Sequence, residues 1–155
     1  MTDEAESALR DLGVSLPTPA APAGSYVPVV RTGNLLFVAG QLPMGPDGLK
    51  HVGRCGEDIA PEDAREAARL CAINILAQVK ATTGSLASIT RVVKLTGFVN
   101  STTAFRDHPA VVNGASDLLV AVLGERGRHA RAAVGVANLP FGAAVEVEAI
   151  VEVAP

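Results

Sequence analysis

The stretch VEVEAIVEV, residues 145–153, constrains the fold of this chain more than any other segment. Apolar residues alternate there with Glu146, Glu148 and Glu152. In a β-strand this alternation directs the three carboxylates to one side and the apolar side chains to the other. Such a strand is stable where one face of its sheet is covered by apolar partners. We therefore predict a sheet with one packed face and with these carboxylates on the opposite face.

The remaining patterns predict a two-layer α+β domain in which a mixed sheet carries two helices on one face, in the order β-β-α-β-α-β-β. Gly33-Asn34 suits a tight hairpin turn, and Gly84 suits a left-handed helix cap. A long loop, residues 44–58, follows the hairpin and contains the turn sequence GPDG. The predicted strands are residues 26–32, 35–43, 88–100, 131–139 and 143–153, and the predicted helices are residues 61–83 and 108–127, the second entered after Pro109.

The helix at residues 61–83 has a one-sided apolar stripe, which is what packing against a sheet requires. Its members are Ala64, Ala67, Ala68, Cys71, Ile75 and Val79.

The amino-terminal segment differs in character from the rest of the chain. Residues 6–14 can form a short amphipathic helix, and the proline-rich stretch SLPTPAAPAG follows as a connector, because proline disfavours helix and sheet interiors. We therefore divide the chain into a helix with its connector, residues 1–21, and a single α+β domain, residues 22–155.

Composition narrows the function classes. The 155 residues suit one domain, and a net charge of -3 with 19% charged residues disfavours binding to nucleic acid or to an acidic membrane surface. There is no signal-like start and no membrane-spanning run, and the two cysteines have no metal-ligand spacing, so we expect a cytoplasmic protein. With 48% hydrophobic residues, part of the surface is expected to be covered by other subunits.

Four residues stand out as candidates for chemistry. Arg131 begins a strand after a basic loop, and a guanidinium there suits bidentate binding of a small carboxylate, although a solvated loop explains it equally well. Glu146 suits a general base if its sheet face is covered, and a water-facing carboxylate if it is not. Tyr26, the only tyrosine, either orients a ligand or seals a core edge. Asn113 is a poor helix former inside a predicted helix, which fits capping or ligand binding.

The three histidines, His51, His108 and His129, lack metal-ligand spacing, and we predict that they are surface residues. The sequence contains no GxSxG, HExxH or phosphate-loop motif.

Four ordered segments, residues 24–43, 91–100, 111–119 and 130–153, together resemble the reactive-intermediate deaminase family, also called Rid or YjgF-like. They read GSYVPVVRTGNLLFVAGQLP, RVVKLTGFVN, VVNGASDLL and ARAAVGVANLPFGAAVEVEAIVEV. The resemblance covers about residues 22–153 and is greatest to a longer subgroup labelled endoribonuclease L-PSP-like.

This resemblance implies a chorismate-mutase-like fold, a homotrimer with ligand clefts between subunits, and hydrolysis of 2-imino or enamine acids to 2-keto acids and ammonia without metal or organic cofactor. Arg131 then matches the arginine that binds the substrate carboxylate, and Glu146 matches the glutamate that positions the attacking water. Tyr26 matches a tyrosine of the pocket wall, and Asn113 matches a helix asparagine of the binding site.

Two positions depart from the family pattern. Ala39 stands where the deaminase branch has serine, and Ala133 stands where it often has cysteine. These losses fit either a more apolar substrate or a pocket that binds a 2-keto acid without turnover, as a sensor. The endoribonuclease label suggests a third function, which neither a basic groove nor paired histidines support.

Overall fold

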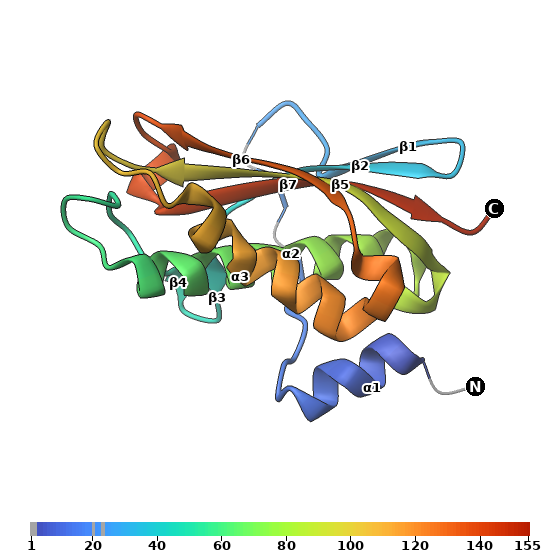
Figure 1. Cartoon of the computed structure of the whole chain (residues 1–155). Coiled ribbons are helices and arrows are strands. Elements are labelled where there is room, and N and C mark those ends of the chain that lie inside the picture. Colours follow the sequence, from blue (N-terminus) through green and yellow to red (C-terminus); the bar gives the residue numbers. More distant parts are fainter. Residues whose placement is uncertain (1–2, 20, 23) are drawn as a thin grey trace.

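The computed structural model describes residues 3–19, 21–22 and 24–155 (Figure 1). Its α-helices are α1 (Glu4–Asp11), α2 (Pro61–Thr83) and α3 (His108–Leu123). Its strands are β1 (Val29–Thr32), β2 (Leu35–Gln41), β3 (Met44–Gly45), β4 (Gly48–Leu49), β5 (Ile89–Asn100), β6 (Ala130–Val136) and β7 (Val145–Val153). Three short 3-10 helices cover Leu86–Ser88, Gly124–Gly127 and Pro140–Gly142.

Five strands form the main sheet in the order β1-β2-β7-β5-β6. Neighbouring strands are antiparallel, except that β5 and β6 run parallel because α3 connects them as a crossover. The predicted order of two strands, helix, strand, helix and two strands is confirmed, and the fold class with it. The hairpin turn is also as predicted, since Thr32 pairs with Leu35 across the two-residue turn and Gly33 has φ +59°.

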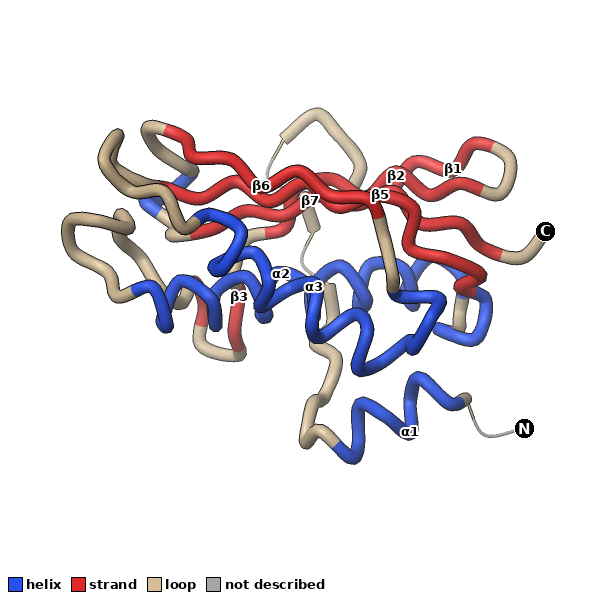
Figure 2. Tube along the Cα trace, in the orientation of Figure 1, coloured by secondary structure: helices blue, strands red, loops and turns tan. Residues whose placement is uncertain are grey.

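Both long helices lie on one face of the sheet (Figure 2). The strand β7 shows why: Val145, Val147 and Val151 are buried toward the helices, whereas Glu148 on the alternate positions is exposed. The predicted division of β7 into an apolar and a carboxylate side is therefore confirmed. No helix covers the carboxylate side in the described part of the chain, and Val30, Phe37 and Val134 are exposed on strands β1, β2 and β6.

The helix α2 begins and ends where its sequence predicts. Glu62 and Asp63 stabilise the positive end of its dipole, and Gly84 closes it with φ +85°. The six predicted stripe residues are all buried. Asn74 and Gln78 are buried as well, which the stripe did not predict.

The helix α3 and the strand β6 differ slightly from their predicted bounds. The helix α3 begins at His108 with Pro109 inside its first turn, because proline needs no N–H partner there, and it ends before Gly124. The strand β6 ends at Val136, since the chain turns into the 3-10 helix at Pro140–Gly142.

The short helix α1 packs against the outer side of the helical layer (Figure 1). Asp3 caps it by accepting from the N–H of Ala5 at 3.0 Å, and its second oxygen accepts from Ser85 Oγ at 2.9 Å. The ammonium of Lys80 lies 2.6 Å from the carboxylate of Glu6. The connector that follows includes Ala20 and Ala23, which lie outside the described residues. The domain boundary at residue 21 stays a prediction.

Residues 44–58 contain more structure than a loop. GPDG forms the predicted turn, but short strands flank it and form the β3–β4 hairpin. The rest of the segment is attached to the ends of longer strands: Val52 bridges to Ala143, and the N–H of Cys55 donates to the carbonyl of Asn100 at 2.8 Å. The segment therefore closes one end of the sheet.

Candidate functional site

The first part of the candidate site forms around Arg131, near the start of the edge strand β6. Its Nη1 donates to Asn113 Oδ1 at 2.7 Å and to Ser116 Oγ at 3.1 Å, and its Nη2 lies 3.4 Å from the carbonyl oxygen of Pro109. The structure thus brings together two residues that the sequence singled out, Arg131 and Asn113. The guanidinium is held against the first turns of α3 and is not splayed into solvent.

These contacts leave one edge of the guanidinium available. Among the described residues, the Nε–H and the second Nη2–H of Arg131 have no hydrogen-bond acceptor. These two N–H groups point in the same direction and form the side-on pair that binds a carboxylate through two parallel hydrogen bonds. The other donors fix the orientation of the guanidinium against α3.

Ser116 and His129 extend this arrangement and were not predicted as site residues. His129 Nδ1 lies 2.6 Å from the carbonyl oxygen of Gly127, and His129 Nε2 lies 2.9 Å from Ser116 Oγ. A carbonyl oxygen can only accept, so Nδ1 donates to it, and in this tautomer Nε2 accepts from the Ser116 hydroxyl. That hydroxyl oxygen is then free to accept from Arg131.

A sequence signal for these two residues existed. Ser116 follows Asn113 by three positions on a helix, and His129 precedes Arg131 by two on an extended segment, so each pair shares a side. His129 is partly buried, and its ring contacts the Arg131 network through Ser116. We call Arg131, Asn113, Ser116 and His129 the arginine group.

Glu146 lies half-buried in β7 on the carboxylate side of the sheet, which no described helix covers and which we call the open face. Burial raises the pKa of its carboxyl above the ordinary value, and the negative charge of Glu148 raises it further. A raised pKa makes a carboxylate a better proton acceptor near neutral pH. The carboxylate lies directly against Gly40 of β2, where a Cβ atom would be 2.0 Å from Glu146 Oε1. Only glycine at position 40 allows Glu146 this position.

Tyr26 lies on the same side of the molecule as Gly40. Tyr26, Ala39 and Gly40 line one cavity of about 320 Å³, although the Tyr26 side chain is largely exposed to solvent. We call Glu146, Gly40, Ala39 and Tyr26 the glutamate group.

Within one chain the two groups cannot act on the same small molecule. Arg131 pairs with the fully buried Leu95, so its side chain leaves the sheet on the helix-covered side, whereas Glu146 pairs with Phe98 and lies on the open face. The strand β5 separates their strands, and their positions differ by three residues along it. Strand geometry then places the two Cα atoms roughly 14 Å apart. The structure therefore brings Arg131 to Asn113 but not to Glu146.

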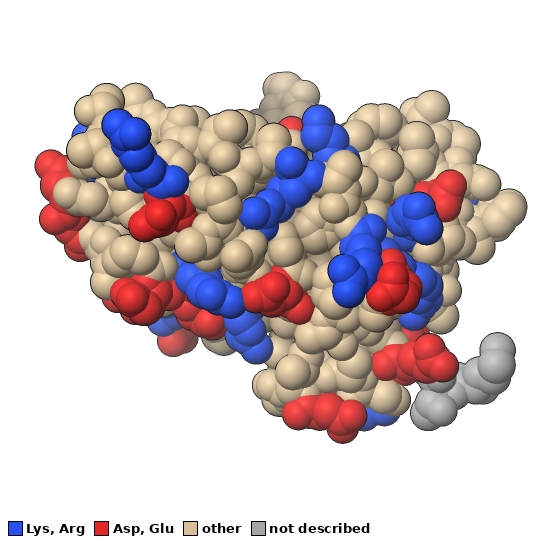
Figure 3. All heavy atoms as spheres, viewed as in Figure 1, with Lys and Arg blue, Asp and Glu red and all other residues tan. Residues whose placement is uncertain are grey.

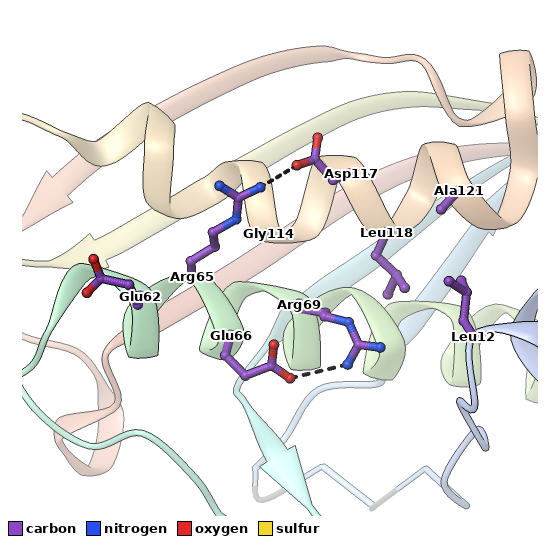
Figure 4. Close-up of a pocket in the computed structure, with 9 residues that line it drawn as sticks. All are labelled: Leu12, Glu62, Arg65, Glu66, Arg69, Gly114, Asp117, Leu118 and Ala121. Carbon is purple, nitrogen blue, oxygen red and sulfur yellow. Dashed lines mark hydrogen bonds and ion pairs between the residues drawn. The ribbon is translucent and has the colours of Figure 1, made fainter.

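A second hollow lies on the outer side of the helical layer, between the end of α1 and the helices α2 and α3, with a volume of about 280 Å³. Figure 4 shows two ion pairs among its charged side chains: Arg65 Nη2 lies 2.6 Å from Asp117 Oδ2, and Arg69 Nη1 lies 3.2 Å from Glu66 Oε1. Because these four charges are already paired, they are less available to bind a ligand than the free N–H groups of Arg131.

The surface charges of the described residues are mixed in sign. On the face in Figure 3 the positive and negative side chains are interspersed, without a continuous basic area. In the described ranges no three His, Cys, Asp or Glu residues gather as metal ligands would. Likewise, none of the described helices is long and apolar enough to cross a membrane.

Comparison with known proteins gives consistent matches over nearly the whole chain. The YjgF/chorismate mutase-like family matches residues 6–153. Protein TCP17 of Trypanosoma cruzi is 50% identical over 93% of this chain and 91% of its own length. The 2-iminobutanoate/2-iminopropanoate deaminase of Dermatophagoides farinae is 31% identical over 89% of this chain and 93% of its own length. The crystal structure of Atu1372 from Agrobacterium tumefaciens, a protein of unknown function, has a TM-score of 0.91 and 52% identity over 97% of this chain and 92% of that chain.

Proposed function

Because this chain belongs to the YjgF/chorismate mutase-like family, we propose that it hydrolyses small 2-imino or enamine acids to 2-keto acids and ammonia in a cleft between two copies of itself. The observation that carries the proposal is the open side-on edge of Arg131, held in place by Asn113 and Ser116. A relative that is 31% identical is named as a deaminase of two such imino acids. Each of these substrates is a small carboxylate.

The chemistry needs few groups. With its carboxylate on Arg131, the imino acid presents its C2 carbon to a water molecule on Glu146. The water oxygen bonds to C2 of the protonated imine, the C=N π electrons pass to nitrogen, and the Glu146 carboxylate accepts a proton from the water, which gives a neutral carbinolamine. Glu146 then returns this proton to the nitrogen. As the C–N bond breaks and ammonia leaves, the hydroxyl proton passes to the Glu146 carboxylate, the C=O bond forms, and a 2-keto acid remains. Positioning and the exclusion of bulk water supply most of the acceleration.

The proposal requires two copies because the arginine group and the glutamate group lie on opposite faces of one sheet. A neighbouring copy that covers the open face with its edge strand brings its own Arg131 toward Glu146. This arrangement also buries the exposed Val30, Phe37 and Val134, which a lone chain leaves in water. We propose a homotrimer, in which each of three interfaces holds one such cleft. The groups involved are protein side chains, and the step as written uses no cofactor.

Activity is tested with 2-iminobutanoate generated in situ by an amino acid oxidase, following the formation of 2-ketobutanoate. Parent protein accelerates the hydrolysis, and Arg131→Ala and Glu146→Gln each abolish the acceleration. Equal rates with and without the parent protein would reject the deaminase function.

Mixing the two inactive variants tests the shared cleft. In a randomly mixed ring, about a quarter of the interfaces combine an intact Arg131 with an intact Glu146, so about a quarter of the parental activity returns. A site contained in one chain predicts no recovery at all.

A second candidate function is binding of a 2-keto acid without turnover, as in a sensor. The observation that favours it is the absence of a hydroxyl or thiol at Ala39 and Ala133, where the deaminase branch carries serine and often cysteine. A sensor shows a melting temperature that rises with 2-ketobutanoate in the parent and not in Arg131→Ala, while imine hydrolysis stays at the uncatalysed rate.

A further inference from the structure

The cavity beside Tyr26 extends well beyond the glutamate group. The proline-rich connector forms one wall, β2 and β3 form another, and the helix α2 forms the floor. Its volume of about 320 Å³ has room for roughly ten non-hydrogen atoms, at about 30 Å³ for each water-sized group. That is more than the one or two side-chain carbons of 2-iminopropanoate or 2-iminobutanoate require. The extra space has no role in the reaction described above.

Gln78 on the floor of this cavity has an unusual position. Only 6% of the residue is exposed, yet its side-chain amide makes no hydrogen bond to any described residue. Asn74, one helical turn earlier, is the informative contrast: its Nδ2 donates to the carbonyl oxygens of Leu42, Met44 and Leu70 at 3.2, 3.0 and 3.0 Å. Asn74 therefore holds the chain in place, whereas the amide of Gln78 remains available to a molecule in the cavity. Among the described residues, no side-chain nitrogen or oxygen that is fully shut off from solvent lacks a partner, so the Gln78 amide is reached from the space of the cavity.

The lining specifies what kind of group enters. No described lining residue carries a carboxylate, an ammonium, a guanidinium or an imidazole, and prolines, Leu42 and Met44 provide apolar walls. A charged group would be desolvated there without a counter-charge. Phe141 also lines the cavity with its side chain 80% exposed and its backbone at φ +57°, a conformation that a bulky residue rarely adopts. The cavity thus suits an unbranched, neutral chain that ends in an amide-like group.

The cavity adjoins the proposed reaction centre through Gly40. This residue lines the cavity and also lies in contact with the Glu146 carboxylate. Glu146 does not line the cavity, and α2 lies on the other face of the sheet, so a substrate whose C2 carbon lies at Glu146 reaches the cavity by passing its side chain around β2 at Gly40.

We propose that this cavity is a side-chain subsite, in which the Gln78 amide pairs with the neutral, amide-like end of a long 2-imino acid. This inference rests on the proposed function, because it assumes that the reacting carbon lies at Glu146. It assigns a substrate class to the chain: long 2-imino acids with an uncharged polar end. The N–H of the Gln78 amide can donate to the oxygen of a carboxamide or ureido group, and the Gln78 oxygen can accept from an N–H of that group.

The test compares 2-imino acids generated by an amino acid oxidase from citrulline, arginine and alanine. Citrulline and arginine have nearly the same shape, but only the side chain of arginine is charged, and the side chain of alanine is too short to enter the cavity. In the parent protein, kcat/KM for the citrulline-derived imine exceeds that for the arginine-derived imine by about tenfold or more, because the charged end is desolvated without a partner.

Two variants at the same position separate recognition from folding. Gln78→Leu lowers kcat/KM for the citrulline-derived imine and leaves the alanine-derived imine unchanged. Gln78→Glu, which is nearly isosteric, reverses the preference in favour of the arginine-derived imine because it supplies the missing counter-charge. Asn74→Leu is the control for a structural loss, and it lowers the melting temperature and the turnover of all three imines alike.

The outcomes distinguish the two proposals. If the parent hydrolyses the alanine-derived imine but neither Gln78 variant changes the ratio of citrulline to arginine, the subsite is wrong and the deaminase stands. If no imine is hydrolysed, the deaminase is wrong, and calorimetric titration with the 2-keto acids of citrulline and arginine decides the subsite. The subsite is supported if the parent binds the 2-keto acid of citrulline more tightly than that of arginine and Gln78→Glu reverses this order. Equal affinities for the two 2-keto acids overturn it.

Discussion

The close contact between Gly40 and Glu146 gives the sharpest prediction from this structure. In Gly40→Ala the new Cβ would lie 2.0 Å from Glu146 Oε1, 2.9 Å from its Cδ and 3.1 Å from its Cγ. Non-bonded carbon and oxygen atoms rarely come closer than about 3 Å, so the carboxylate has to move by at least about 1 Å. A misplacement of that size in a catalytic group costs about 100-fold in rate. We therefore expect kcat/KM for 2-iminobutanoate to fall by about 100-fold.

Stability should respond far less. The atoms that the new methyl group meets are the far end of a flexible, half-exposed side chain, which can swing away without moving the backbone. We expect less than about 1 kcal/mol of destabilisation, below the usual cost of overpacking a core. The assays are steady-state imine hydrolysis and urea denaturation of the same preparations.

Gly33→Ala is the matched control. A Cβ at Gly33 meets no atom within 4 Å, but the backbone there has φ +59°. The variant therefore loses about 1–2 kcal/mol of stability through strain while kcat/KM stays at the parental value. The reasoning is refuted if Gly40→Ala keeps its activity within about threefold of the parent, or if its activity loss merely follows its loss of stability.

Three further predictions concern the charged groups. Arg131→Lys loses one of two charge-assisted hydrogen bonds to the substrate carboxylate, so KM rises about tenfold or more while the melting temperature changes little. Ser116→Ala removes the link between His129 and Arg131 and raises KM about threefold to tenfold, whereas Ser101→Ala, which removes a comparable bond to His108, leaves KM unchanged. Because the pKa of Glu146 is raised, the folded parent binds more protons than the unfolded chain at pH values between the ordinary pKa, near 4.5, and the raised pKa. The free energy of unfolding of the parent therefore falls as pH rises through that window. Glu146→Gln therefore melts above the parent at about pH 7 and equally with it at about pH 3, and a lower melting temperature at neutral pH would contradict the assigned shift.

The sequence predicted the elements whose pattern is long and periodic. The alternation in β7 and the apolar stripe of α2 each repeat often enough to define a buried side. The β3 and β4 strands, of two residues each, have no periodicity to detect, and only their GPDG turn was predictable.

The candidate site was predictable in part. Arg131 and Asn113 stood out by residue type and position, the family resemblance implied their binding roles, and the structure places them in contact. The roles of Ser116 and His129 depend on how α3 crosses β6, and that of Gln78 depends on where the connector lies over α2. The spacing of Ser116 from Asn113 and of His129 from Arg131 indicates which residues share a side, but local patterns do not show which distant segments meet there.

The position of Arg131 and Glu146 on opposite faces of one sheet has a consequence for dosage. If each reaction centre combines parts of two chains, a dilute chain has no working centre, and output rises more steeply than the number of chains until assembly is complete. Specific activity measured across a dilution series would then fall at low concentration. In a cell, modest changes in expression would be amplified in the rate of the reaction.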